Sequence, residues 1–229
     1  MTRKKIMIVF LLFLIGIGGT TYLLIDYRNQ QTFEASLKAS DVTELQQAVE
    51  AVDLSTKERN RYIRKFQETL EYEKALVLLD RASAGNQQNW FYVAQFASTD
   101  VVKQWLAAGA SIKQVNSNKQ NVLHVSTSVN RSVDAYALLV KQASKSQLNQ
   151  LDRFGHTPLY YATVDQNQEA MELLLAAGAT PDKGTDLPIY ETVKQNRKDL
   201  YQLLQKNGAS PTRKQVKRLA KTYGAASFK

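Results

Sequence analysis

The sequence contains no cysteine, and this absence excludes several kinds of chemistry at once. Without thiols the chain forms no disulfide, no thiolate nucleophile and no zinc site built on cysteine. A lipid anchor on a cysteine that follows an export signal is excluded for the same reason. A chain without cysteine suits an oxidising compartment as well as any other, so the cysteine count does not choose a location.

Histidine is nearly as scarce, because only His124 and His156 are present. They lie thirty-two residues apart, whereas a metal or catalytic site needs three or four convergent ligands. The sequence also lacks a phosphate-binding glycine loop, a G-x-S-x-G turn and an H-E-x-x-H helix. We therefore expect a protein that is not an enzyme and has no metal, no cofactor and no small-molecule substrate.

The charge is strongly positive, with a formal net charge of +9 and an isoelectric point near 9.6. No stretch interleaves basic and aromatic residues as nucleic-acid-binding modules do, so we expect no nucleic-acid partner. Hydrophobic residues make up 44% of the 229-residue chain. This is enough for one sizeable domain, or for a shorter domain together with a membrane element.

Charged residues are absent from residues 6–25, and Arg3, Lys4 and Lys5 stand directly before this run. Twenty apolar residues in a helix span about 30 Å, the thickness of a hydrocarbon core. The pattern predicts a transmembrane signal-anchor over 6–25. The preceding cations place residues 1–5 in the cytoplasm and the rest of the chain outside it.

A cleaved signal peptide is the alternative interpretation of the same residues. Its apolar core would be residues 6–15, and Gly16-Ile17-Gly18 would supply the small residues of a cleavage site. Apolar residues resume at 22–25, which makes the run longer than a signal peptide needs and favours the anchor. Both interpretations export the remainder of the chain.

Residues 26–39 are polar and without a clear period, which predicts a short stalk. Residues 40–84 contain helical periods that begin at Asp41, Ser55 and Glu73, each without a distinctive motif. We interpret 40–84 as divergent helical repeats that close the amino-terminal end of a stack.

The segment 152–184 has the most distinctive pattern in the chain. Thr157 is suited to cap a helix, and Pro158 fits the first helical position because no amide donor is needed there. A leucine-rich stretch follows and ends at Gly178, where a left-handed residue would close a second helix. Two helices this short cannot bury an apolar face alone, so the unit needs similar neighbours on both sides.

This segment resembles the ankyrin repeat: a turn with glycine, a T-P-L helix start, a leucine-rich second helix, and a Gly-Ala end. Weaker copies surround it. Trp90 and Phe91 take the places of Pro158 and Leu159 in one, N-V-L-H-V-S at 121–126 starts another, and L-P-I-Y at 187–190 starts a third. In the copy at 121–126, Gln142 stands where the terminal glycine belongs, so the pattern does not predict where its second helix ends.

The resemblance implies an all-α ankyrin-repeat solenoid of helix-turn-helix repeats with short hairpin loops, behind an amino-terminal transmembrane helix. About four repeats would occupy 85–211, and 212–229 would form a basic carboxy-terminal cap helix. It also implies that His124, at the histidine of the T-P-L-H-x-A motif, makes structural hydrogen bonds between repeats.

Ankyrin stacks bind other proteins with their hairpin tips and first helices, so the resemblance also implies a binding surface. The implied positions are Arg153, Phe154, His156, Val164 and Asp165 in the clearest unit, and Ser117, Asn118, Gln120, Ser128 and Val129 in the preceding one. Phe154 beside Arg153 is the kind of pair that anchors an interface. The alternative for each position is an ordinary surface residue, or for Phe154, packing on the next repeat.

The carboxy-terminal segment holds the main local excess of charge, with no acidic residue after Asp199. Its basic residues are Arg213, Lys214, Lys217, Arg218 and Lys221. They predict contact with an anionic lipid or an acidic partner, each basic group contributing about 1 kcal/mol at such a surface. A solvated cap helix is the simpler alternative.

Together these features predict a protein-binding module held by the inner membrane of a bacterium, with its repeats in the periplasm. By resemblance to exported bacterial ankyrin proteins, it would inhibit or sequester a partner, as an immunity protein does with a secreted toxin such as a lipase. The alternative is a cell-envelope scaffold, or a chaperone for an exported enzyme.

Overall fold

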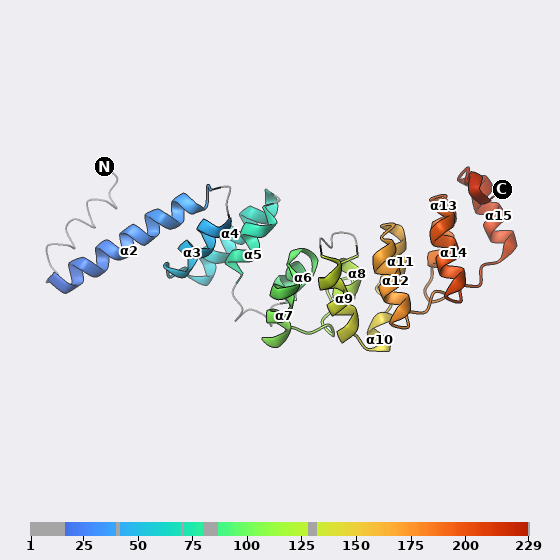
Figure 1. Cartoon of the computed structure of the whole chain (residues 1–229), viewed down its shortest axis with the longest axis horizontal. Helices are drawn as coiled ribbons and strands as arrows, with labels where there is room; N and C mark the ends of the chain where they lie inside the picture. Colours follow the sequence, from blue (N-terminus) through green and yellow to red (C-terminus); the bar gives the residue numbers. More distant parts are fainter. Residues whose placement is uncertain (1–16, 40–41, 70, 80–86, 128–131, 229) are drawn as a thin grey trace. The chain divides into compact units, whose positions relative to one another are not determined.

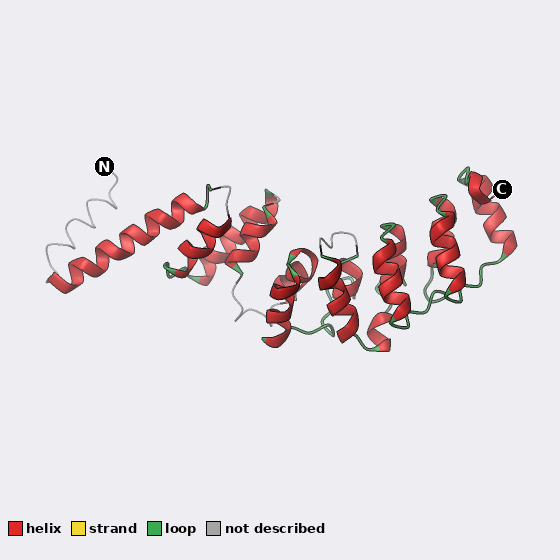
Figure 2. Ribbon diagram, viewed as in Figure 1, coloured by secondary structure: helices red, strands yellow, loops and turns green. Residues whose placement is uncertain are grey.

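The computed structural model describes residues 17–39, 42–69, 71–79, 87–127 and 132–228, and within these ranges every regular element is a helix (Figures 1 and 2). The chain divides into two compact units, Met1–Leu79 and Asp80–Lys229. The all-helical class expected from the sequence is confirmed for these residues.

The first unit contains α2 (Ile17–Ser36), α3 (Val42–Glu50), α4 (Thr56–Glu68) and α5 (Tyr72–Leu78). Helix α3 packs against α2 and α5, and α4 packs against α5. These elements bury a core of their own that includes Leu45, Phe66 and Leu78.

Most of the expected stalk belongs to this unit and is not a spacer. Residues 26–36 continue α2, and Phe33 in their midst is 0% exposed, with its ring edge-on to that of Tyr62 at 5.5 Å. A single buried aromatic among polar residues gives too weak a period to predict a helix, which is why the sequence pattern suggested a stalk.

Residues 6–16 of the expected transmembrane segment lie outside the described part of the chain, and its residues 17–25 form the first part of α2. Within the described part, no helix is both long and apolar enough to cross a membrane.

The second unit is a series of helix pairs. The pairs are α6 (Gln87–Phe96) with α7 (Thr99–Ala107), α8 (Val122–Val125) with α9 (Val133–Gln142), α11 (Pro158–Val164) with α12 (Gln168–Ala176), and α13 (Pro188–Lys194) with α14 (Lys198–Lys206). The first helices pack in a row from α6 through α8 and α11 to α13, and α7, α9 and α12 form a second row. Figure 1 shows this order along the unit.

The predicted helix limits of the clearest repeat are confirmed in detail. The Thr157 side chain accepts a hydrogen bond from the Tyr160 amide at 3.2 Å, and Pro158 follows at the first helical position of α11. After α12 the chain turns through Gly178 with φ +97°, the left-handed conformation that favours glycine. Leu159 and Leu174 lie fully buried between the two helices and their neighbours.

One short helix, α10 (Lys145–Leu148), was not predicted. Helix α9 ends at Gln142, and Ala143 is extended instead of left-handed. Ser144 and Gln147 then form a reciprocal capping box that starts α10. Gln142 replaces glycine here because the chain enters another helix and makes no left-handed turn.

The unit ends with α15 (Arg213–Thr222) and the short 3-10 helix η2 (Ala226–Phe228). Helix α15 packs on α13, and Leu219, Ala220 and Ala225 are buried with Val193. The Phe228 ring meets Tyr201 edge-on at 5.0 Å. The segment closes the apolar end of the row, as expected of a cap.

Candidate partner-binding surface

The hairpin at residues 152–156 is built around the side chain of Asp152. Its Oδ1 accepts hydrogen bonds from the amides of Phe154 at 2.8 Å and His156 at 3.0 Å. The Asp152 amide donates to the His156 carbonyl at 2.9 Å. Gly155 lies between them with φ +81°, a left-handed conformation that closes the turn.

The preceding hairpin repeats this construction with different residues. The Oδ1 of Asn116 accepts from the amides of Asn118 at 2.9 Å and Gln120 at 3.0 Å. Lys119, with φ 61°, takes the left-handed place of Gly155. An amide or carboxylate oxygen at the first hairpin position therefore fixes the shape of both tips.

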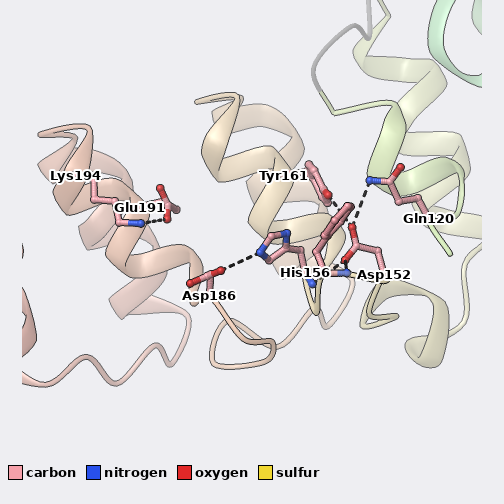
Figure 3. A network of polar contacts seen from close by, with 8 residues as sticks. Gln120, Asp152, His156, Tyr161, Asp186, Glu191 and Lys194 are labelled. Carbon is pink, nitrogen blue, oxygen red and sulfur yellow. Dashed lines mark hydrogen bonds and ion pairs between the residues drawn. The ribbon is translucent and has the colours of Figure 1, made fainter. Parts of the chain in front are cut away.

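Neighbouring hairpins are hydrogen-bonded to one another. The Arg153 amide donates to the Asn118 carbonyl at 2.8 Å, and the Thr185 amide donates to the Gly155 carbonyl at 2.9 Å. The Gln120 side chain reaches Asp152 Oδ2 at 3.4 Å (Figure 3). The tips consequently form one continuous edge with a fixed backbone.

Asp152 also ties the hairpin to the first helix of its own repeat. The Tyr161 hydroxyl donates to Asp152 Oδ2 at 2.6 Å. Burial alone would raise the pKa of Asp152, but the hydrogen bonds from Tyr161, His156 and Phe154 outweigh it and hold this pKa below its usual value. Burial, and then the bond to Asp152, raise the pKa of Tyr161 to about 12.

Phe154 and Arg153 project from the tip of this rigid hairpin. The Phe154 side chain is 55% exposed, which excludes the alternative that it packs into the next repeat. The Arg153 guanidinium lies 5.5 Å from the centre of the Phe154 ring, and its Nη1 donates to Asn118 Oδ1 at 3.4 Å. An exposed aromatic ring and a cation are thus held together on an ordered backbone.

His156 extends the aromatic group toward α11. Its ring stacks on Tyr160 with centroids 3.9 Å apart and lies 6.3 Å from the Phe154 ring. Its Nε2 is 3.0 Å from Asp186 Oδ2, which belongs to the following hairpin (Figure 3). Tyr160 and Asp186 were not among the predicted surface residues. The pair Tyr160 and Tyr161, directly after Pro158 and Leu159, was a signal in the sequence for the exposed side of α11.

The other histidine, His124, is structural, as the resemblance implied. It is buried, its Nδ1 accepts from the Asn121 amide at 3.1 Å, and its Nε2 lies 3.1 Å from the Gln150 carbonyl. Asn121 Oδ1 also lies 2.8 Å from Nδ1, and with Nδ1 as the acceptor of the Asn121 amide a neutral ring carries its proton on Nε2. Burial lowers the pKa of His124 to about 4.

The structure separates the predicted positions into groups. Ser117 is exposed beside Asn118 and belongs to the hairpin edge. Val164 and Asp165 are exposed at the opposite end of α11, where Asp165 accepts from the Thr127 hydroxyl at 2.8 Å. Ser128 and Val129 lie outside the described residues.

The predicted basic residues gather on α15, and all are exposed. They are Arg213, Lys214, Lys217, Arg218 and Lys221. Among the residues that the structure describes, no group of three or more His, Asp or Glu side chains is placed to hold a metal ion.

The comparisons agree with this architecture. Residues 90–185 match the family model for ankyrin repeats in three copies. The ankyrin repeat domain of human ASB11, known from a crystal structure, is 21% identical, with a TM-score of 0.53. That alignment covers 59% of this chain and 63% of the ASB11 chain, less than two thirds of its length. No curated protein matches the sequence.

Proposed function

We propose that this chain, whose residues 90–185 match the family model for ankyrin repeats, binds another protein through the edge formed by its hairpins at 116–120 and 152–156. The observation that carries this proposal is the exposed pair Arg153 and Phe154. Aromatic and arginine side chains are enriched among the few residues that dominate the binding energy of protein interfaces, and a backbone already fixed by hydrogen bonds loses little entropy on binding.

The test is affinity capture with the full chain and with the double variant Arg153→Ala, Phe154→Ala. The matched control is Glu172→Ala, Gln202→Ala, two exposed residues on the second helices α12 and α14. Truncating anchor residues typically lowers affinity about tenfold or more. The proposal fails if the hairpin variant and the control retain the same set of captured proteins.

We further propose that residues 6–25 anchor the protein in the inner membrane, with the repeats outside the cytoplasm. The support is the apolar run and the three cations that precede it. Phosphatase fused after Asp26 should be active only if that point is exported. Activity of a cytoplasmic reporter alone at the same position would contradict this topology.

Within this topology we propose that binding inhibits or sequesters an exported protein, such as a secreted toxin of the lipase class. The support is the resemblance to exported bacterial ankyrin proteins, together with an anchor that would keep the module where such a toxin acts. The decisive measurement is the activity of the captured partner with and without the full chain. Unchanged partner activity would favour the scaffold or chaperone alternative.

A further inference from the structure

We propose that the partner carries an acidic segment, which lies on α15 while an apolar side chain of the same partner contacts Phe154. This inference rests on the proposed protein-binding function and adds the chemical class of the partner. It follows from the register of α15, from the charges on it, and from its place in the row of first helices.

The register of α15 continues that of α13. In α13 the buried residues are Pro188, Ile189, Thr192 and Val193. In α15 the residues turned inward at the same spacing are Gln215 and Val216, which are half-buried, and Leu219 and Ala220, which are buried. The exposed Lys217, Arg218 and Lys221 therefore take the helix positions that Tyr190, Glu191 and Lys194 have in α13.

These α13 positions belong to the same side of the unit as the aromatic group. The corresponding residues of α11 are Tyr160, Tyr161 and Val164, and Tyr160 stacks on His156 of the hairpin. The row of first helices consequently presents aromatic side chains at α11 and only cationic ones at α15, where the row ends. Between them, Lys194 is already paired with Glu191 within α13 (Figure 3).

The five basic side chains of α15 have no acidic partner within the described part of the chain. None of the five takes part in an ion pair found there, and α15 itself contains no acidic residue. Arg213 and Lys214 occupy its first turn, where the helix dipole disfavours positive charge. Without a partner of opposite sign, this arrangement is unfavourable.

A capping role does not explain the single sign of charge. An outer cap must be polar to stay soluble, and residues of mixed sign serve equally well. Helices α4 and α14 carry acids together with bases on their exposed positions, whereas α15 carries bases alone. Electrostatic complementarity to an acidic partner accounts for the difference.

A protein is favoured over a lipid surface because the cationic face continues the aromatic one. The aliphatic residues of α15 are turned toward α13, so apart from the exposed Tyr223 at its carboxy-terminal cap the helix offers no apolar side to insert into a membrane. Adjacent helices pack about 10 Å apart, so α15, two helices along the row, lies about 20 Å from α11. About six extended residues span that distance.

The test uses the full chain in a nanodisc of neutral lipid and fluorescent synthetic peptides as probes. The main probe has a tryptophan separated by about six residues from a run of about five glutamates. One version of this probe has the tryptophan before the glutamates, and a second version has it after them. The comparison probes replace tryptophan by alanine, or the glutamates by glutamines, and binding is followed by anisotropy at low and high salt.

We expect the main probe to bind more tightly than either comparison probe and to weaken as salt is raised. The triple variant Lys217→Glu, Arg218→Glu, Lys221→Glu should lower its affinity at least about tenfold. The variant Lys113→Glu, Lys145→Glu, Lys183→Glu makes the same change of net charge at exposed residues elsewhere in the unit and should leave it unchanged.

Three results would overturn the inference, and they are distinguishable. If Phe154→Ala weakens the main probe while the triple variant does not, the hairpin surface stands and the acidic segment is wrong. If neither variant changes binding, both the inference and the proposed surface fail. If the α15 cations instead bind vesicles containing phosphatidylglycerol and not the peptides, the ligand is an anionic lipid.

Discussion

At the scale of single residues, two hairpins reach the same shape with different side chains. Asp152 and Asn116 both accept two backbone amides with one oxygen, so the first hairpin position needs an acceptor and not a charge. The left-handed position is Gly155 in one hairpin and Lys119 in the other. The sequence predicted the glycine in the turn, but lysine at that position carried no recognisable signal.

The substitution Gly155→Ala should destabilise the repeats more than Gly178→Ala. Both glycines have left-handed φ, which costs alanine about 1 kcal/mol or more. At Gly155 a Cβ would also lie 2.1 Å from Thr185 Oγ1, whereas at Gly178 nothing lies within 4 Å. In urea unfolding we expect the free energy of unfolding to fall by about 3 kcal/mol in Gly155→Ala and by about 1 kcal/mol in Gly178→Ala. Equal losses would show that the hairpins do not approach as described.

His124 should make stability depend on pH in the acidic range. Its pKa is near 6.5 when unfolded and about 4 in the fold, so the unfolded state binds the proton more readily. The contribution of the neutral ring is complete above pH 6.5 and is lost as pH falls toward 4. The slope is at most about 1.4 kcal/mol per pH unit.

This pH dependence is measured by urea unfolding at several pH values. The variant His124→Gln should be less stable at pH 7 and should show a flatter dependence between pH 6.5 and 4. A wild-type stability that stays constant over this range would contradict the buried, neutral assignment.

At the scale of elements, the helix limits marked by a familiar local motif were predictable and the others were not. The Thr-Pro start of α11 and the glycine after α12 are local signals with local causes, and both are confirmed. The end of α9 and the whole of α10 were not predicted. They depend on the capping box of Ser144 and Gln147 and on buried Leu148, whose contacts lie outside any single helical period.

Replacing Gln142 by glycine should therefore weaken the protein, although glycine is the usual residue at this place in the repeat. Gln142 is the last residue of a right-handed helix, where glycine costs about 1 kcal/mol. The reciprocal change, Gly178→Gln, should also destabilise, because its φ is +97°. The midpoint of thermal unfolding should fall in both variants. A higher midpoint for Gln142→Gly would show that α9 ends in a left-handed turn.

At the scale of the whole molecule, the sequence predicted the stack of repeats and left much of its surroundings open. Residues 90–185 repeat one pattern, clearest at 152–184, since each helix pair must bury the same faces against its neighbours. The first unit has no such motif, and α2 packs into it through Phe33, a single buried aromatic among polar residues. For the candidate surface, Arg153 and Phe154 were predictable from the hairpin, whereas Tyr160 and Asp186 required the packing of His156 between repeats.

The central claim is that a partner protein contacts the hairpin edge at Phe154. The most direct measurement is crosslinking in living cells with a photoreactive phenylalanine analogue placed at position 154 of the full chain. The same analogue at Glu172, exposed on the second helix α12, is the control. The account predicts a discrete adduct with another protein from position 154 and none from 172. An adduct from position 172 alone, or the same adducts from both positions, would contradict it.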